Sequence, residues 1–455
     1  MSTTHAPDVQ TGPSRATFAT SVGVIFTMIG VAVGLGNFWR FPYLVGRYGG
    51  TAFVLFYLLV VVAIGIPGQM AEWALGRYTQ RGPVGAFERA GVRGGRVLGW
   101  TLFALVIASL SYYAAAVGWV LCFAIAQPLA AFGIPFEPAS ILPPATGFDA
   151  RSYTLHLAFT GGTLALCALV LTRGLRRGVE AVSRVLIPFL GASLIILIVR
   201  SLTLDGAGEG LRWYLWKFRL EDLTGSVMLA ALGHVMFSLS LGGTFMVIYG
   251  SYLGGHENLR RNAFATAGAD TLVGLLAGVA IFPAVFAFGL PPDSGPGLLF
   301  DTLPRVFAAI PGGPVFAFLF FASLSSVALL SSIAALEVVV AGVTDNTRMG
   351  RTPAAWGAAG LILLLSMIPT LNLGVFVPWD LTFGSGIQTA GALLAVLTVG
   401  WSLDRATALR ELSRGSRRPF PIWLFWWLRV VVPGGILAVG VWWFLSEVLR
   451  VVGGV

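Results

Sequence analysis

Long apolar stretches separated by short polar segments follow one another from about residue 19 to residue 447. A mostly apolar run of about 18 or more residues is long enough to cross a bilayer as a helix. Several of the runs exceed the ~20 residues that a bilayer needs, so tilted or interrupted helices are expected. The pattern predicts eleven membrane spans, at 19–47, 51–78, 97–127, 153–172, 179–201, 223–252, 262–289, 314–343, 353–370, 374–402 and 421–447.

The composition agrees with a membrane protein. Charged residues make up 11% of the chain and the mean hydropathy is +0.83, whereas soluble domains carry about 25% charged residues. The net charge of +9 would suggest nucleic acid as a partner of a soluble chain. Cys122 and Cys167 both lie in apolar runs, so neither a disulfide framework nor a cysteine metal site is expected.

The basic residues are distributed unevenly between alternate connecting segments. If the N-terminus is cytoplasmic, the inner segments carry nineteen basic residues and the outer segments eight. Cytoplasmic loops of membrane proteins show this excess, so the net charge needs no nucleic-acid partner. We predict a multi-pass protein of the cell (inner) membrane with its N-terminus in the cytoplasm. The odd number of spans then places the C-terminus outside; the oligomeric state is not indicated.

Glycines and polar residues interrupt the first span near its middle. The segment reads GVAVGLGNFWRFP and contains Gly30, Gly34 and Gly36. A glycine costs about 1 kcal/mol inside a helix, so a continuous helix is not expected there. The spacing of Gly30 and Gly34 also suits close helix packing. Packing alone leaves Asn37 and Arg40 unexplained, because polar groups at membrane depth are costly and usually functional.

The sixth span carries a second interruption, FSLSLGGT at Phe237–Thr244. A simple kink is the alternative, but spans 1 and 6 open two successive sets of five spans. Interrupted helices at matching places in two halves indicate a transporter binding site at the bilayer midplane. Unwound backbone exposes carbonyls that bind a cation and amides that attract a carboxylate.

At these residues the sequence resembles the neurotransmitter:sodium symporter family, in its bacterial amino-acid branch. The resemblance extends over nearly the whole chain, and some bacterial members also have eleven spans. It implies an all-α polytopic membrane protein with two inverted five-helix repeats, broken helices 1 and 6, and an eleventh helix. The motifs that carry it are VGLGNFWRFP at Val33–Pro42, Gly49-Gly50-x-Ala52-Phe53 and Glu72-Trp73-Ala74-x-Gly76-Arg77.

The resemblance also implies a division of the chain. We expect a cytoplasmic N-terminal segment at 1–18 and a transporter core at 19–402. Within the core, spans 1–5 occupy 19–201 and spans 6–10 occupy 223–402. A cytoplasmic loop and span 11 complete the chain at 403–455.

Two sodium sites are implied. The first would use Ala32, Asn37, Ser238 and Asp270, together with the substrate carboxylate. Many relatives have asparagine where Asp270 stands, and this carboxylate would supply the charge that chloride provides in animal members. We therefore expect Na⁺ as the coupling ion and no requirement for chloride.

The second sodium site would use the carbonyls of Gly30, Val33 and Val327 and the hydroxyl of Ser331. Here the sequence departs from the family pattern, because the usual oxygen ligand position holds Leu330. A hard cation needs oxygen ligands, so either Ser325–Ser326 or Ser332 takes part, or the site is weakened.

The residues implied for the substrate surround both breaks. Gly34 stands where monoamine carriers place an aspartate, so the substrate must bring its own carboxylate, which Tyr113 would bind. Small residues at Gly243 and Ala335 predict room for a large or aromatic side chain. The implied set is Val31, Ala32, Gly34, Leu35, Gly36, Ser109, Tyr113, Phe237, Ser238, Ser240, Gly243, Ser331 and Ala335.

The resemblance further implies two gates. Outside, Arg40 and Asp380 would approach each other above Tyr113 and Phe237. Inside, Arg15 and Asp345 would pair, with Phe18 and Tyr252 beside them. Exposed ion pairs contribute about 1 kcal/mol or less, which suits contacts that must break.

The predicted function is sodium-coupled uptake of an amino acid by alternating access, without a catalytic residue. The alternatives are a proton-coupled or single-sodium transporter, with protons carried by Glu72, Asp270 or Glu337, and a sensor that binds an amino acid without transporting it. A channel would need a continuous polar stripe, which the spans lack. A membrane enzyme is not favoured, because no metal, nucleophile or phosphate-loop motif is found on the spans.

Overall fold

The computed structural model describes residues 17–134, 136–293, 297–443 and 445. Within these residues the regular structure is helical, and every predicted span contains helix. The elements are α1 (Ser21–Ala32), η1 (Gly36–Arg40), α2 (Phe41–Arg47), α3 (Thr51–Val60), η2 (Val61–Gly65), α4 (Ile66–Thr79), α5 (Pro83–Arg89), α6 (Gly95–Ala131), η3 (Pro138–Ile141), α7 (Ala150–Thr172), η4 (Leu175–Glu180), α8 (Ala181–Leu202), α9 (Ala207–Leu215), η5 (Leu220–Asp222), α10 (Gly225–Ser238), α11 (Phe245–Ser251), α12 (Leu259–Ala287), η6 (Leu298–Thr302), α13 (Leu303–Ala309), α14 (Gly313–Asn346), α15 (Arg351–Ser366), α16 (Leu373–Trp379), η7 (Asp380–Gly386), α17 (Ile387–Leu397), η8 (Thr398–Ser402), α18 (Arg405–Ser413) and α19 (Ile422–Trp443).

Eight helices among the described residues are long and apolar enough to cross a membrane on their own. The bent pair Ser21–Ala32 and Gly36–Arg47 makes a ninth span. Two predicted spans have shorter helices: α10 has 14 residues and continues after a gap as α11, and α15 has 16 residues. Nine of the eleven predicted spans therefore meet the length criterion, counting the bent pair as one. The sixth span is divided into α10 and α11, and the ninth is the short helix α15.

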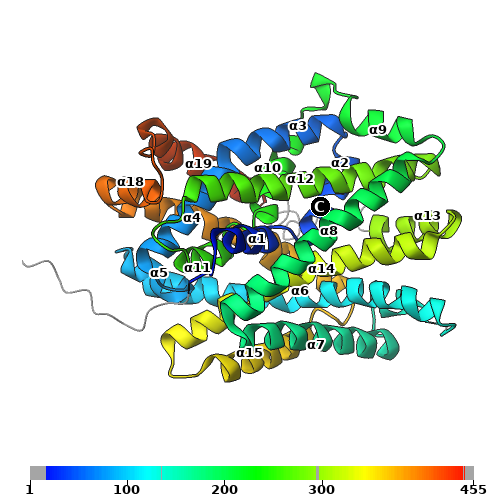
Figure 1. Ribbon diagram of the computed structural model, residues 1–455, viewed down its shortest axis with the longest axis horizontal. Coiled ribbons are helices and arrows are strands. Elements are labelled where there is room, and N and C mark those ends of the chain that lie inside the picture. Colours follow the sequence, from blue (N-terminus) through cyan, green and yellow to red (C-terminus); the bar gives the residue numbers. More distant parts are fainter. Residues whose placement is uncertain (1–16, 135, 294–296, 444, 446–455) are drawn as a thin grey trace, which may run out of the picture.

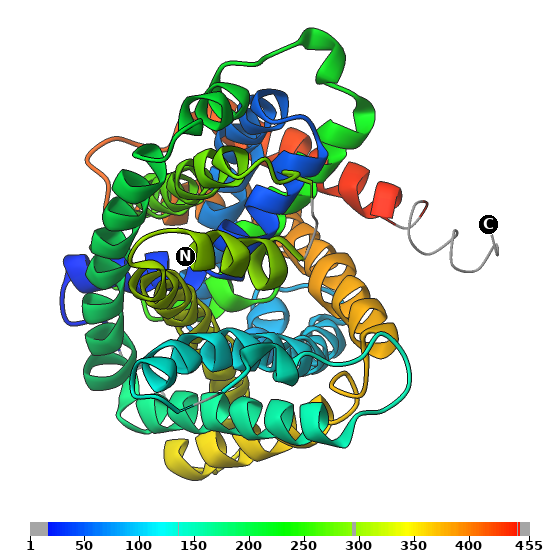
Figure 2. The same ribbon diagram turned by 90° about the vertical axis from the view of Figure 1, so that its right-hand side faces the viewer.

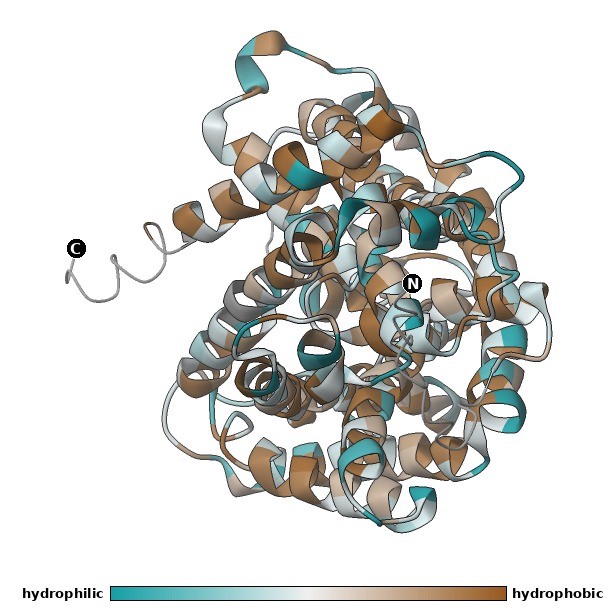
Figure 3. Cartoon of the chain, turned by 90° about the vertical axis from the view of Figure 1, so that its left-hand side faces the viewer, coloured by the Kyte–Doolittle hydropathy of each residue, from teal (hydrophilic) through white to brown (hydrophobic). Residues whose placement is uncertain are grey.

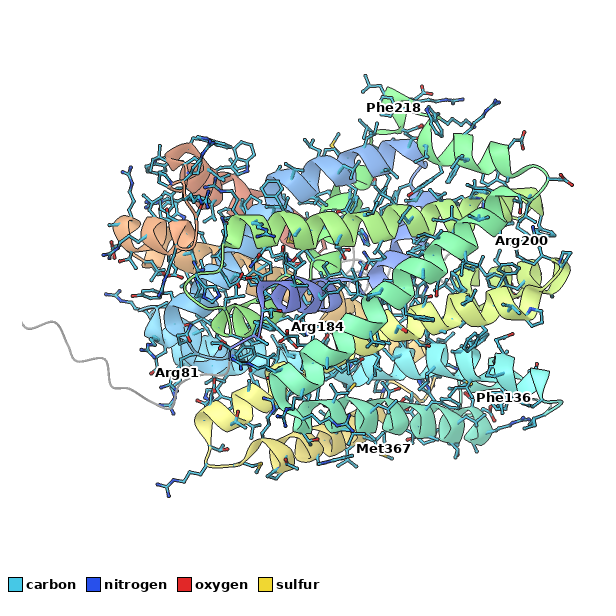
Figure 4. All side chains as sticks on the ribbon, viewed as in Figure 1. Arg81, Phe136, Arg184, Arg200, Phe218 and Met367 are labelled. Atoms are coloured by element: carbon cyan, nitrogen blue, oxygen red, sulfur yellow. The ribbon has the colours of Figure 1, made fainter. Side chains whose placement is uncertain are left out.

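The long helices run roughly side by side along the horizontal axis of Figure 1. The short helices α5 and α18 lie at one end of this bundle, and α9 and α13 lie at the other. Arg81 lies toward the first end, whereas Phe136 and Arg200 lie toward the second (Figure 4). The segments that follow α8 and α12 thus contribute the short helices α9 and α13 to the second end.

Packing within the bundle follows the membrane-helix pattern. Helix α14 packs against α6, α7 and α8, while α11 packs against α4 and α19 packs against α17. Figures 1 and 2 place α7 and α15 on one side of the bundle and α3 and α19 on the opposite side. Seen from the end that carries α5 and α18, apolar residues dominate the helices and hydrophilic residues gather in loops and helix ends (Figure 3).

Candidate functional site

The first span is broken directly after Ala32. Val33 has extended backbone (φ −67°, ψ 122°), which stops α1, and the chain resumes as η1 and α2 at an angle of 53°. The last four carbonyls of a helix lack intrahelical partners, so the break exposes backbone oxygen at mid-span. Two of the carbonyl oxygens near the break accept hydrogen bonds from serine side chains. Ser240 Oγ donates to Val31 O at 2.9 Å, and Ser331 Oγ donates to Val33 O at 3.1 Å.

The sixth span is broken between Ser238 and Phe245. Ser240 (φ 52°), Gly242 (φ 89°) and Thr244 (φ 57°) all have left-handed backbone, which non-glycine residues adopt only when their surroundings hold them there. Gly242 has a second reason to be glycine, because a Cβ there would lie 1.5 Å from the carbonyl oxygen of Gln388 in α17. The break is thus pressed against the tenth span.

A buried carboxylate binds the backbone that this second break leaves free. The amide of Gly242 donates to Glu72 Oε1 at 2.7 Å, and Glu72 is 1% exposed. Glu72 therefore holds the sixth span in its broken conformation, and it does so from α4, which packs against α11.

A cavity of about 50 Å³ lies between the two breaks. The structure brings together twelve of the thirteen residues that the sequence implied for the substrate; Gly243 does not line this cavity. Four further residues line it that the sequence did not indicate. The complete lining is Val31, Ala32, Gly34, Leu35, Gly36, Ser109, Leu110, Tyr112, Tyr113, Phe237, Ser238, Ser240, Phe245, Ser331, Ala335 and Gln388.

The room expected beside Gly243 is filled by Phe245. A Cβ on Gly243 would lie 1.9 Å from the Phe245 ring, so the ring occupies the space that the glycine opens. A second cavity adjoins on the far side and shares Ser109, Phe245 and Gln388 with the first. In this conformation Phe245 divides the available space in two, and the expectation of a roomy pocket stays a prediction.

The lack of a side chain at Gly34 lets two hydroxyls approach the first span closely. A Cβ on Gly34 would lie 2.6 Å from Ser331 Oγ and 3.1 Å from the Tyr113 hydroxyl oxygen. The amide of Leu35 lies 3.5 Å from the same Tyr113 oxygen. Hydroxyl and amide groups thus converge on a small space, and such groups suit a carboxylate.

Asn37, Ser238 and Asp270 form one buried polar cluster. Asn37 Nδ2 donates to Asp270 Oδ1 at 2.8 Å and to Asp270 O at 2.9 Å, and Ser238 Oγ donates to Asp270 Oδ2 at 2.7 Å. All three are at most 1% exposed. Asn37 Oδ1 accepts from the amide of Gly34 at 2.9 Å, which fixes the turn after α1. Oxygen atoms from spans 1, 6 and 7 therefore meet next to the cavity, as a hard cation requires.

The region expected to hold a second cation contains hydrocarbon. A Cβ on Gly30 would lie 3.2 Å from Leu330 Cδ1, so the Leu330 side chain faces the end of α1. Ser326 Oγ instead donates to Ala322 O in its own helix at 2.7 Å. Ser325 and Ser326 line a separate apolar cavity that does not include the breaks. The alternative that invoked the Ser325–Ser326 pair is not supported by these positions.

At the side of the cavity expected to face outward, Arg40 and Asp380 lie close enough to interact electrostatically. The Arg40 guanidinium lies over the Phe237 ring, 4.8 Å from its centre. The Tyr112 hydroxyl forms a hydrogen bond with Asp380, a contact that the sequence did not suggest. The expected outer pair is thus assembled, with an additional tyrosine bound to its acid.

At the inner side, Arg15 lies outside the described residues. Asp345 Oδ2 accepts from the amide of Gly82 at 2.8 Å. Phe18 makes an edge contact with Tyr252, with ring centres 6.4 Å apart, and the Tyr252 hydroxyl donates to Glu337 Oε1 at 2.6 Å. Phe18 and Tyr252 are therefore adjacent, as expected.

Glu337 is an ion-pair partner rather than an isolated acid. Arg351, the first residue of α15, donates to both of its carboxylate oxygens and to the carbonyl oxygen of Leu171. Glu337 is fully buried, and a buried acid held by arginine is a structural element. Of the three candidate proton carriers, Glu337 is thereby the least suited, because its charge is permanently paired.

Comparison with known proteins agrees with this geometry. The pattern of the Sodium:neurotransmitter symporter family matches residues 15–131 and 153–446. The chain is similar to "Uncharacterized sodium-dependent transporter YhdH" of Bacillus subtilis, with 34% identity over 93% of this chain and 96% of that protein. It is also similar to an uncharacterized sodium-dependent transporter of Haemophilus influenzae, with 32% identity over 96% of this chain and 98% of that protein.

Among solved structures, the fold matches a crystal structure of MhsT in complex with L-phenylalanine. The TM-score is 0.82 and the identity 34%, over 94% of this chain and 99% of that chain. The match confirms the predicted fold: two inverted five-helix repeats with interrupted first and sixth helices, followed by an eleventh helix.

Proposed function

The chain belongs to the Sodium:neurotransmitter symporter family, and on that premise we propose that it couples the entry of sodium to the uptake of an amino acid. The family and the named relatives are of sodium-dependent transporters. Beyond sodium-dependent transport, we propose the class of substrate, its movement into the cell and the roles of individual residues. It also places the chain in the cell (inner) membrane, with the α5–α18 end in the cytoplasm.

One observation carries the proposal: a group of hydroxyl and amide groups beside Gly34 and an oxygen cluster at Asp270 lie side by side between the two breaks. Gly34, Tyr113 and the amide of Leu35 would bind the substrate carboxylate. Asn37, Ser238 and Asp270 would bind sodium beside it. Ion and carboxylate then stabilise each other, because opposite charges attract strongly in a site that excludes water. This mutual stabilisation would couple the entry of sodium to the uptake of the amino acid.

The substrate that we propose has a large apolar or aromatic side chain. Val31, Leu110, Phe245 and Ala335 give the cavity an apolar side. If the Phe245 ring turns away, the adjoining cavity becomes continuous with the first, since both are lined by Phe245. The similar protein MhsT has been solved with L-phenylalanine, and phenylalanine is therefore the first substrate to test.

Alternating access would follow from the two gates. Arg40, Asp380 and Phe237 would close the outer side, while Asp345, Phe18 and Tyr252, with Arg15, would close the inner side. Opening one side while the other is closed moves substrate without a continuous pore. Each sodium ion that enters gains about 2.3 kcal/mol per 100 mV, which corresponds to about fiftyfold accumulation of substrate.

Leu330 favours one alternative within this function, namely coupling to a single sodium ion. A leucine gives no oxygen ligand, and it faces Gly30 where the second ion would bind. Asp270 and the first site would then drive uptake alone. Chloride is not expected to take part, because Asp270 already supplies a negative charge at the first site.

Uptake into proteoliposomes tests the proposal. Labelled phenylalanine should accumulate when a sodium gradient and an inside-negative potential are imposed, and it should not accumulate with potassium in place of sodium. Accumulation driven by a proton gradient without sodium would establish proton coupling instead. Sodium-independent binding without accumulation would identify a sensor and refute the proposal.

A further inference from the structure

An arginine lies inside the last membrane span. Arg429 comes seven residues after the start of α19 at Ile422, which places its Cα about 10 Å along the helix. Arginine costs roughly 2.5–3.5 kcal/mol at the centre of a membrane helix and marks function or a compensating partner. In the described part of the chain it forms no ion pair, and its buried Nε has no hydrogen-bond partner.

The guanidinium of this arginine lies over the rings of two tryptophans. The Arg429 guanidinium lies 4.2 Å from the ring centre of Trp401 and 5.3 Å from that of Trp426. Trp401 Nε1 donates to the backbone carbonyl of Arg429 at 2.9 Å. A second guanidinium, that of Arg405, lies 6.0 Å from the Trp426 ring. We call Trp401, Arg405, Trp426 and Arg429 the Arg–Trp cluster.

The Arg–Trp cluster lies on the exposed surface of the helix bundle. Trp401 is 58% exposed and Trp426 is 46% exposed, although both belong to apolar helices that cross the membrane. Helical side chains lean toward the N-terminal end of their helix, and α19 begins at the end of the bundle where α18 lies (Figure 1). The Arg429 guanidinium is therefore directed toward the headgroups of that leaflet, where tryptophans concentrate.

Stacking leaves the hydrogen-bonding capacity of the two arginines largely unused. A cation–π contact engages the face of a guanidinium, whereas its N–H donors point outward in its plane. Neither arginine has an ion-pair partner among the described residues. The acid next to Arg405 in the sequence, Asp404, caps α18 by accepting from the amide of Thr407 at 3.0 Å. Two positive groups with free donors thus border one exposed aromatic surface.

We propose that the Arg–Trp cluster binds the phosphate headgroup of an anionic phospholipid. Arginine presents paired N–H donors that match phosphate oxygens, and basic sites between membrane helices on the cytoplasmic side bind such headgroups. The acyl chains would lie along the exposed apolar residues of α19, which include Val430 and Leu437. The lipid would join η8 to α19 at the edge of the bundle, away from the substrate cavity.

Native mass spectrometry of delipidated protein tests this. Phosphatidylglycerol and phosphatidylcholine of equal chain length are titrated against the wild type, Arg429→Gln and the control Arg417→Gln, which removes an exposed charge from the loop between α18 and α19. The wild type should bind phosphatidylglycerol in preference to phosphatidylcholine. Arg429→Gln should weaken phosphatidylglycerol binding at least tenfold, and Arg417→Gln should leave it unchanged.

Three outcomes would overturn the proposal. They are equal binding of both lipids, equal losses in Arg429→Gln and Arg417→Gln, and displacement of bound lipid by millimolar inorganic phosphate, which would identify a site for a free anion. If Arg429→Gln does not fold, as judged by its thermal melting, the exposed Arg405→Gln replaces it and should lose at least threefold in affinity. None of these measurements depends on transport activity.

Discussion

Replacing Gly34 by alanine tests the carboxylate site most directly. The added Cβ would lie 2.6 Å from Ser331 Oγ and 3.1 Å from the Tyr113 hydroxyl oxygen, closer than the ordinary contact of 3.4–4 Å. Both hydroxyls would have to move back, and the methyl group would occupy the space proposed for the substrate carboxylate. The substrate should then lose at least one hydrogen bond to its charged end, worth about 1.5–3 kcal/mol.

This loss corresponds to a Kd for phenylalanine about 12- to 150-fold higher. The assay is scintillation-proximity binding of labelled phenylalanine in saturating sodium. Gly357→Ala is the matched control, because a Cβ at Gly357 in α15 meets nothing within 4 Å; its Kd should equal that of the wild type. If Gly34→Ala bound phenylalanine as tightly as the control does, the placement of the carboxylate beside Gly34 would be refuted.

Four further substitutions probe the site and its support. Asp270→Asn removes the carboxyl group and leaves a single acceptor oxygen for Asn37 and Ser238, which now use one carboxyl oxygen each, so sodium titration of substrate binding should show at least tenfold lower sodium affinity, and chloride should now raise that affinity; an unchanged titration contradicts the first sodium site. Leu330→Ser supplies a hydroxyl facing Gly30, so the Hill coefficient for sodium should rise from near one toward two, while loss of a buried leucine side chain, worth about 2–5 kcal/mol, lowers the melting temperature. Glu337→Gln leaves the Arg351 charge uncompensated and should destabilise the protein by about 3–5 kcal/mol, seen as a lower melting temperature in detergent; an equal melting temperature would show that the ion pair is dispensable. Gln388→Leu removes a buried amide oxygen that has no partner among the described residues, so phenylalanine should compete better against tyrosine than in the wild type, and an unchanged ratio would place Gln388 outside the substrate's reach.

The breaks were predictable because their causes are local. Glycine, serine and threonine weaken a helix wherever they stand, and polar groups such as Asn37 at membrane depth need a function. The span pattern was predictable for the same reason, since the length of an apolar run sets whether it can cross the bilayer. The family resemblance then located twelve of the thirteen cavity residues that it implied.

What was missed depends on contacts between distant segments. Gly243 indicated free space, but Phe245, only two residues later, turns its ring into that space because the left-handed backbone at Thr244 redirects the chain. Gln388 reaches the cavity from α17, whose close approach follows from Gly242 and Gly391. No property of either residue alone signals these positions.

The pairing of Glu337 with Arg351 was missed for a related reason. The two residues lie on different helices, and only the turn after α14 brings them together. The sequence shows an acid in an apolar run and a base beyond it, which is equally compatible with proton transfer. The distinction requires the distance between them.

The buried Arg77 has a consequence for how the chain is assembled. It is 2% exposed, and it binds the side chain and backbone of Glu411 and the backbone of Glu257. The ribosome synthesises Glu411 334 residues after Arg77, so the second span inserts long before its counter-charge exists. Until α18 docks, an uncompensated cation stands at the end of α4. A chain that ends after Ser402 would lack Glu411 and would leave the buried Arg77 without the carboxylate that its Nε binds.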